Sequence, residues 1–244
     1  MAVTDESAKH RSEWGAVVFA LVFPTLLTVV YFILLAGHPA AVQQGAFGIG
    51  KLLQFAFPAF WIVVIRKMRI RWTVPTRSDL VWGMGLGLGL LAATLGLYHL
   101  GLKPAGVFAG PAADAIRQKI EGIGVRSPSR YFVMSIFYVV LHSLLEEYYW
   151  RWFVFGQLRL LTSLPAAIVI SSLGFTAHHV CVVSHYFGWL SPMSFLLSLA
   201  VTAGGVIWAW IYHRTGSLYG PWICHAFVDA AIFIVGYDLV TNIQ

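Results

Sequence analysis

Apolar runs of about 20 residues recur along this chain and set its organisation. Because about 20 predominantly apolar residues let a helix cross a bilayer, each run predicts one transmembrane helix. The pattern therefore predicts an all-α fold, a polytopic transmembrane helix bundle of about seven helices, with no room for a soluble domain of any size. The apolar runs, bounded by polar or turn residues, are 14–36, 47–66, 80–100, 131–158, 164–184, 191–212 and 217–238.

The composition agrees with a membrane protein. The chain of 244 residues is 59% hydrophobic and only 11% charged, whereas soluble domains are about 25% charged. Its net charge of +6 comes mostly from Lys and Arg at the ends of apolar runs, which indicates orientation and lipid contact. No basic-aromatic motif predicts a nucleic-acid partner. The two cysteines, Cys181 and Cys224, are predicted to be small buried hydrophobes.

The first apolar run is longer than the core of a signal peptide, which is about 7–15 residues. We therefore expect 14–36 to remain in the mature protein as a helix. The chain is short and shows no targeting extension. This is typical of an integral, multi-pass protein of a prokaryotic cytoplasmic membrane.

Two segments of the N-terminal half need an interpretation. In the linker 101–130, Pro111 can open a short helix that continues through Glu121. The linker is either an interfacial connector or a lid beside a site. The second segment carries glycines at i and i+4, and this spacing predicts close helix packing, since no complete G-x-G-x-x-G follows a strand. These glycines are Gly83, Gly85, Gly87 and Gly89.

Three acidic residues lie well inside apolar runs: Glu146, Glu147 and Asp229. An ionisable group at this depth costs on the order of 2.5–3.5 kcal/mol and is a functional-site hypothesis by default. Residues four apart share a helix face, so Glu147 can pair with Arg151, and His142 lies one turn from Glu146. The two glutamates point about 100° apart. The Glu147–Arg151 pair has either a packing or a functional role, whereas Glu146 is directed elsewhere.

Histidines occur in two later apolar runs. The sequence FTAHHV places Phe175 and His179 four residues apart, with His178 beside them, and CHAFVDA does the same for His225 and Asp229. Three helices thus carry polar residues that can face inward. If these helices converge, they enclose a small water-filled pocket within the bilayer, buried between the C-terminal helices.

The residue types in this predicted pocket suit amide hydrolysis. A carboxylate and a histidine that share one water form a general-base arrangement, and a second histidine can stabilise an oxyanion. The same types bind zinc, although no H-E-x-x-H is present and such a site would be assembled across helices. A non-enzymatic scaffold or proton-coupled carrier could also use them, but carriers usually show internal repeats, and none stands out here.

Three motifs, in this order on successive apolar runs, resemble the CAAX protease and bacteriocin-processing (CPBP, or ABI) family of intramembrane proteases. They are E-E-x-x-x-R at 146–151, F-x-x-x-H at 175–179 and H-x-x-x-[N/D] at 225–229. On this basis we divide the chain into N-terminal transmembrane helices with an interfacial linker, 1–130, and a catalytic helical core, 131–240.

The resemblance implies an intramembrane endopeptidase that acts on a membrane-associated or lipidated protein or peptide. It implies that Glu146 and His179 activate the attacking water, and that His225 and Asp229 stabilise the oxyanion. We expect a glutamate-type mechanism without a cofactor, with a divalent metal such as zinc as the alternative. The expected partners are the substrate and the lipid bilayer.

The resemblance implies structural roles for Glu147 and Arg151, and His178 has a separate predicted role. Glu147 and Arg151 would hold the helix geometry, and His178, which is extra to the motif, is predicted to pack or to line the pocket. The prenyl-protein branch of the family has Asn where this chain has Asp229. An ionised aspartate cannot donate a hydrogen bond to an oxyanion. Asp229 is therefore protonated, or accepts from His225 and orients the ring, or binds a metal.

Overall fold

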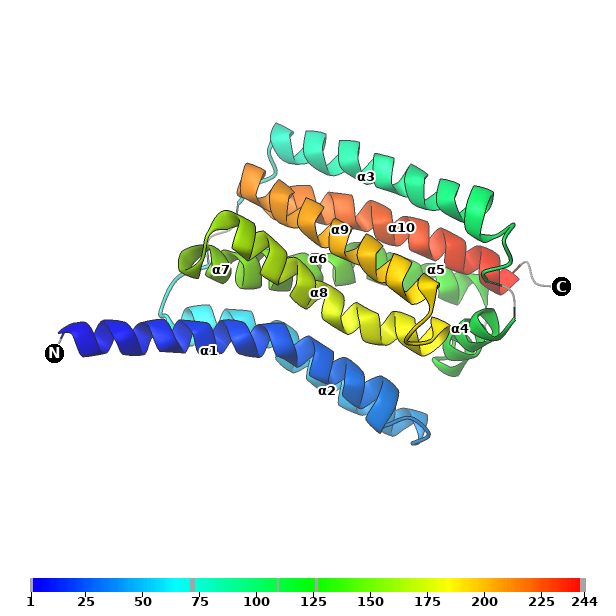
Figure 1. Cartoon of the computed structure of the whole chain (residues 1–244), viewed down its shortest axis with the longest axis horizontal. Coiled ribbons are helices and arrows are strands. Elements are labelled where there is room, and N and C mark those ends of the chain that lie inside the picture. The colour runs from blue at the N-terminus through cyan, green and yellow to red at the C-terminus, as the bar shows by residue number, and fades with distance from the viewer. Residues whose placement is uncertain (1, 71–72, 109, 126, 242–244) are drawn as a thin grey trace. The chain divides into compact units, whose positions relative to one another are not determined.

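The computed structural model describes residues 2–70, 73–108, 110–125 and 127–241. Within these residues the chain forms helices joined by short connections and contains no strand (Figure 1). Among the described residues, seven helical spans are long and apolar enough to cross a membrane, and each overlaps one predicted run. The predicted all-α, polytopic fold is confirmed. The spans are His10–Leu34, Ala40–Ile65, Arg77–Leu102, Pro128–Leu161, Leu164–Phe187, Pro192–Thr215 and Tyr219–Thr241.

The spans consist of α-helices, several of which continue into π-helical segments. The α-helices are α1 (Ala2–Val29), α2 (Ala40–Phe60), α3 (Arg77–Leu97), α4 (Pro111–Gly122), α5 (Pro128–Ile136), α6 (Ser143–Glu147), α7 (Gly156–Leu161), α8 (Leu164–Phe187), α9 (Pro192–Thr215) and α10 (Tyr219–Thr241). The π-helical segments are η1 (Val30–Leu34), η2 (Trp61–Ile65), η3 (Tyr98–Leu102), η4 (Phe137–His142) and η5 (Tyr148–Phe155).

Local sequence signals explain where several helices begin. Thr76 caps α3 and forms a capping box with Asp79. The Ser163 side chain caps α8. The helix that Pro111 was expected to open is α4, which follows Gly110 at a φ of +79°, a conformation that glycine adopts readily.

The span Pro128–Leu161 changes its helical type four times. The five residues of α6, which include both glutamates of the E-E motif, lie between η4 and η5. A π-helix bonds i to i+5, is rare, and occurs frequently at functional sites. The length of the apolar run predicted this span but gave no signal for its π segments.

The helices belong to two compact units, each built from segments far apart in the sequence. The first unit comprises Met1–Thr73 and Tyr148–Ala209, and the second comprises Val74–Glu147 and Trp210–Gln244. In the first unit, α1 packs against α8, and the Tyr149 hydroxyl donates to the Ala20 carbonyl oxygen at 2.8 Å. The division at residue 130, drawn from the motifs, stays a prediction.

In the second unit α3 packs along α10 (Figure 1), and two glycines make this packing possible. A Cβ on Gly83 would lie 2.7 Å from the Gly220 carbonyl oxygen, and a Cβ on Gly87 would lie 2.6 Å from the Phe227 ring. No such neighbour lies within 4 Å of a Cβ added at the other two glycines of this stretch. The packing interpretation therefore holds for one face of the glycine pattern.

Polar contacts fix both ends of α3 and η3 in this unit. At the start, the buried Asp79 carboxylate accepts from the Thr76 hydroxyl at 2.7 Å and from the Gly220 N–H at 3.2 Å. At the other end, Asp238 accepts from the Tyr98 hydroxyl at 2.6 Å and from Lys103 at 2.5 Å. The register of α3 against α10 is thus set at both ends of the span.

Candidate active site

The second unit holds a cluster of three carboxylates around the imidazole ring of His225. Its Nδ1 lies 2.7 Å from Glu147 Oε1, and its Nε2 lies 3.5 Å from Asp229 Oδ1 and 3.8 Å from Glu146 Oε2. His225 and both glutamates are at most 3% exposed. Contact with a ring that can carry a positive charge offsets the cost of placing carboxylates at membrane depth.

Glu146 has a histidine near each of its oxygens. Besides His225 at Oε2, His142 Nε2 lies 3.8 Å from Oε1, across one helical turn. A second imidazole therefore lies beside this carboxylate, as the spacing predicts. The Glu146 carboxylate can accept a proton from water and pass it on to a neighbouring imidazole.

In the first unit, Arg151 is almost completely buried and contacts two later helices of that unit. Its guanidinium lies 4.8 Å from the Phe175 ring centre and 5.0 Å from that of Trp208, and it donates to the Gly205 carbonyl oxygen at 3.4 Å. A buried arginine between two aromatic faces stabilises the packing of these helices.

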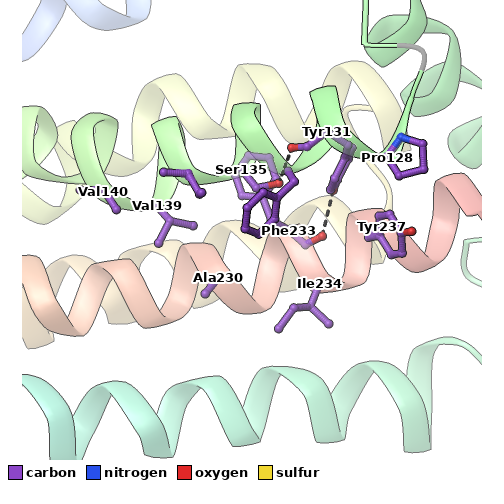
Figure 2. A pocket seen from close by; sticks show the side chains of 11 residues that line it. Pro128, Tyr131, Ser135, Val139, Val140, Ala230, Phe233, Ile234 and Tyr237 are labelled. Carbon is purple, nitrogen blue, oxygen red and sulfur yellow. Dashed lines mark hydrogen bonds between the residues drawn. The ribbon is translucent and has the colours of Figure 1, made fainter.

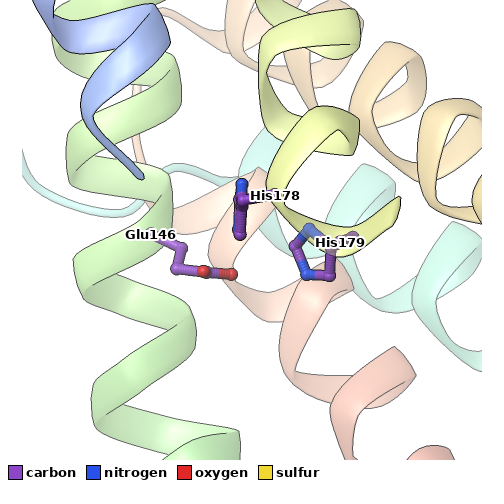
Figure 3. A group of neighbouring side chains, drawn as sticks. All are labelled: Glu146, His178 and His179. Atoms are coloured by element: carbon purple, nitrogen blue, oxygen red, sulfur yellow. The ribbon is translucent and has the colours of Figure 1, made fainter. Parts of the chain in front are cut away.

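The two adjacent histidines of α8 have different surroundings within the first unit. Figure 3 draws both side chains, together with that of Glu146 on α6. His178 is buried and stacks on Trp150, with interplanar angle 4° and ring centres 5.7 Å apart, which agrees with the predicted packing role. His179 Nδ1 lies 2.9 Å from the Phe175 carbonyl oxygen. A carbonyl only accepts, so Nδ1 carries the proton and Nε2 of the neutral ring carries the lone pair, as a base requires.

Comparison with known protein families gives a match. Residues 128–231 match the family model described as type II CAAX prenyl endopeptidase Rce1-like. This segment is therefore similar to the CAAX protease family. No curated protein and no solved structure matches the chain. The CAAX protease match contains all four predicted catalytic residues: Glu146, His179, His225 and Asp229.

The similarity to the CAAX protease family supports the predicted class of activity, an intramembrane endopeptidase with a membrane-associated protein as substrate. The seven apolar spans agree with an integral, multi-pass protein.

The structure brings only part of the predicted site together within one unit. Glu146, His225 and Asp229 lie in the second unit, where their contacts follow directly from the coordinates. His179 and Arg151 belong to the first unit, so their predicted pairing with the two glutamates stays a prediction. The contact of Glu147 with His225 was missed, because no spacing pattern links residues on separate helices.

An apolar groove runs between α5–η4 and α10 of the second unit (Figure 2). Its volume is about 560 Å³, within the range of roughly 300–1,000 Å³ for ligand pockets. The Tyr131 hydroxyl spans it and donates to the Phe233 carbonyl oxygen at 2.9 Å. At one end the lining includes Val140, on the same helical span as Glu146, and Ala230, next to Asp229. The groove therefore leads toward the carboxylate cluster around His225.

Proposed function

We propose that this protein is an intramembrane endopeptidase that hydrolyses a peptide bond in a lipidated or membrane-associated protein. The observation that carries the proposal is the buried cluster of Glu146, Glu147 and Asp229 around His225, within the segment that matches the CAAX protease family. A packing role alone does not account for three carboxylates around one ring in an apolar span, because each of them costs on the order of 2.5–3.5 kcal/mol there.

In this proposal Glu146 and His179 activate the attacking water, as the family motifs imply. Glu146 would take a proton from the water, and His179 would hold that water through the lone pair of Nε2. The hydrogen bond from His179 Nδ1 to the Phe175 carbonyl oxygen supports this role, because it leaves the proton off Nε2. The resulting hydroxide attacks the carbonyl carbon of the substrate.

His225 and Asp229 then stabilise the oxyanion that forms on the carbonyl oxygen of the substrate. A protonated His225 ring can donate from Nε2, which is the nitrogen that faces Asp229 Oδ1 at 3.5 Å. We propose that Asp229 stays ionised and attracts a proton to this nitrogen, so that the ring carries a positive charge when the attack begins. As charge develops on the carbonyl oxygen, the Nε2–H group donates a hydrogen bond to it, which lowers the barrier.

We propose that the reaction needs no resident metal. Carboxylate and imidazole groups are zinc ligands as well as acid–base groups, so the residue types alone fit either mechanism. The glutamate-type mechanism uses the protein's own groups for each proton transfer. The zinc-dependent alternative differs in one measurable property, its sensitivity to chelators.

The apolar groove of the second unit supports a lipid-modified substrate. Apart from Ser135 its lining is aliphatic and aromatic, and Val140 lies six residues from Glu146, about 9 Å along a helix axis. An apolar chain in the groove would place the peptide to which it is attached beside the carboxylates. Binding energy from such a remote, non-reacting group can orient the scissile bond.

A groove-filling substitution tests the lipid part of the proposal. Val139→Trp should fill the groove and raise KM for a lipidated peptide, with little effect on the same peptide without its lipid. Val133 lies on the same helical span, is 67% exposed and does not line the groove, so Val133→Trp is the matched control. An equal effect of Val139→Trp on both peptides would exclude the groove as the lipid site.

The proteolytic part is tested with Glu146→Gln in purified, reconstituted protein. The variant keeps the size and hydrogen-bonding shape of the side chain but cannot act as a base. We expect an unchanged thermal unfolding midpoint and a loss of cleavage by about 10²–10⁴-fold. Cleavage at the wild-type rate by a folded variant would contradict the mechanism.

A further inference from the structure

The contact between Glu147 and His225 gives this glutamate a role beyond helix packing. Glu147 is fully buried, and its Oε1 lies 2.7 Å from His225 Nδ1, the shortest of the three carboxylate distances to this ring. We propose that Glu147 is a positioning residue, which accepts the Nδ1 hydrogen of His225 and thereby aims Nε2 at Glu146 and Asp229. The catalytic consequence rests on the proposed function, but the hydrogen bond itself does not.

The two nitrogens of the His225 ring differ in their distances to the neighbouring carboxylates. A charge-assisted N–H···O bond is about 2.7–2.9 Å long, and only the Glu147 contact lies in this range. The contacts of Nε2, at 3.5 Å to Asp229 and 3.8 Å to Glu146, are longer than a hydrogen bond. The Nδ1 proton is therefore the one that is held, and the ring is fixed in one orientation.

Without Glu147, the opposite arrangement would be favoured. Asp229 and Glu146 both face Nε2, so they would draw the proton of a neutral ring to that nitrogen. In a membrane span there is little water to satisfy Nδ1 instead. Glu147 thus decides between two tautomers that place the lone pair on different sides of the ring.

This choice matters for the proposed chemistry. With the proton on Nδ1, Nε2 of the neutral ring can accept a proton, and after accepting it can donate a hydrogen bond to an oxyanion. A carboxylate on the opposite nitrogen stabilises the resulting imidazolium, as the aspartate does in a Ser-His-Asp triad. Glu147 would act through His225 and would not touch the substrate.

Nitrogen NMR of the His225 ring tests the positioning directly. Protein labelled with ¹⁵N at histidine would be measured in detergent, and the His225 signals would be assigned by their loss in His225→Gln. We expect a proton on Nδ1 in the wild type and a smaller Nδ1-protonated population in Glu147→Ala. An unprotonated Nδ1 in the wild type, or identical His225 signals in both proteins, would overturn the proposal. This readout does not depend on protease activity.

Kinetics separate positioning from folding. Glu147→Ala should lower kcat by about 10²–10⁴-fold with little change in KM, as removal of a ring-orienting carboxylate does elsewhere. Glu147→Gln keeps an oxygen that accepts from Nδ1 and should lose less. The control is Asp238→Asn, which weakens a polar contact of the same unit with Tyr98 and Lys103. If activity losses in all three variants simply follow their losses of thermal stability, Glu147 has only a structural role.

Discussion

Single side chains in this protein show how ionisable groups are kept at membrane depth. Glu146 has a histidine beside each of its carboxylate oxygens, and Glu147 has a close imidazole contact, so neither carboxylate faces only apolar groups. The sequence predicted the contacts within one helix, His142 with Glu146 and His225 with Asp229, because i and i+4 side chains meet on one face. The Glu147 contact joins two helices, and its prediction would have required the packing of α6 on α10.

The Asp229 side chain yields a prediction at this scale. Asparagine keeps an oxygen that accepts from His225 and adds an N–H group that can donate to an oxyanion. We therefore expect Asp229→Asn to keep activity within about tenfold, and Asp229→Ala to lose about 10²–10³-fold in kcat. The measurement is peptide cleavage by purified variants. An equally large loss with asparagine and with alanine would contradict this expectation and show that the negative charge itself is required.

The buried carboxylate of Asp79 yields a second prediction. Asp79→Ala removes an acceptor from the Thr76 hydroxyl and from the Gly220 N–H, and we expect it to lower the free energy of unfolding by about 1–3 kcal/mol. Asp114→Ala is the control, because that carboxylate is 59% exposed and should change stability by less than about 0.5 kcal/mol. Denaturant titration in detergent compares them. Equal effects would mean that the Asp79 contacts do not hold α3.

At the scale of elements, hydrophobicity alone predicted the spans, since each must present about 20 apolar residues to lipid. It could not predict the π segments on either side of α6, because a π-helix and an α-helix bury similar apolar faces. The short helix α4 was predicted from its opening proline. The glycines of α3 predicted close packing, but the face involved emerged only from the contacts with α10.

Alanine substitutions along α3 test this packing. Gly83→Ala and Gly87→Ala place a Cβ within 2.7 Å of α10 atoms and should destabilise the protein by about 1–3 kcal/mol each. Gly85→Ala and Gly89→Ala meet no neighbour within 4 Å and should be neutral or stabilising by up to about 1 kcal/mol. Thermal unfolding in detergent distinguishes the two pairs. Four equal values would contradict the packing of α3 along α10.

At the scale of the whole molecule, the chain is a multi-pass membrane protein whose family match covers 128–231, from α5 into α10. The motifs predicted this family because each one lies on its own apolar span in the expected order. The motifs could not predict that the matching segment contributes to two compact units. They also do not choose between a glutamate and a zinc mechanism, since the same residue types serve both.

Chelation tests the mechanism on the intact protein. We expect the cleavage rate to be unchanged after dialysis against a strong chelator, and we expect no stoichiometric zinc in elemental analysis of the active protein. A loss of activity that added zinc restores would establish the metal-dependent alternative.

The most direct measurement of the central claim is product analysis in ¹⁸O-labelled water. Purified protein in lipid vesicles would be incubated with a lipidated peptide, and the fragments identified by mass spectrometry. Hydrolysis by an activated water predicts one internal bond cleaved, one ¹⁸O atom in the new C-terminal carboxyl group, and no product with Glu146→Gln. Absence of any product from the folded wild-type protein over a range of membrane peptides, or equal labelling by Glu146→Gln, would contradict it.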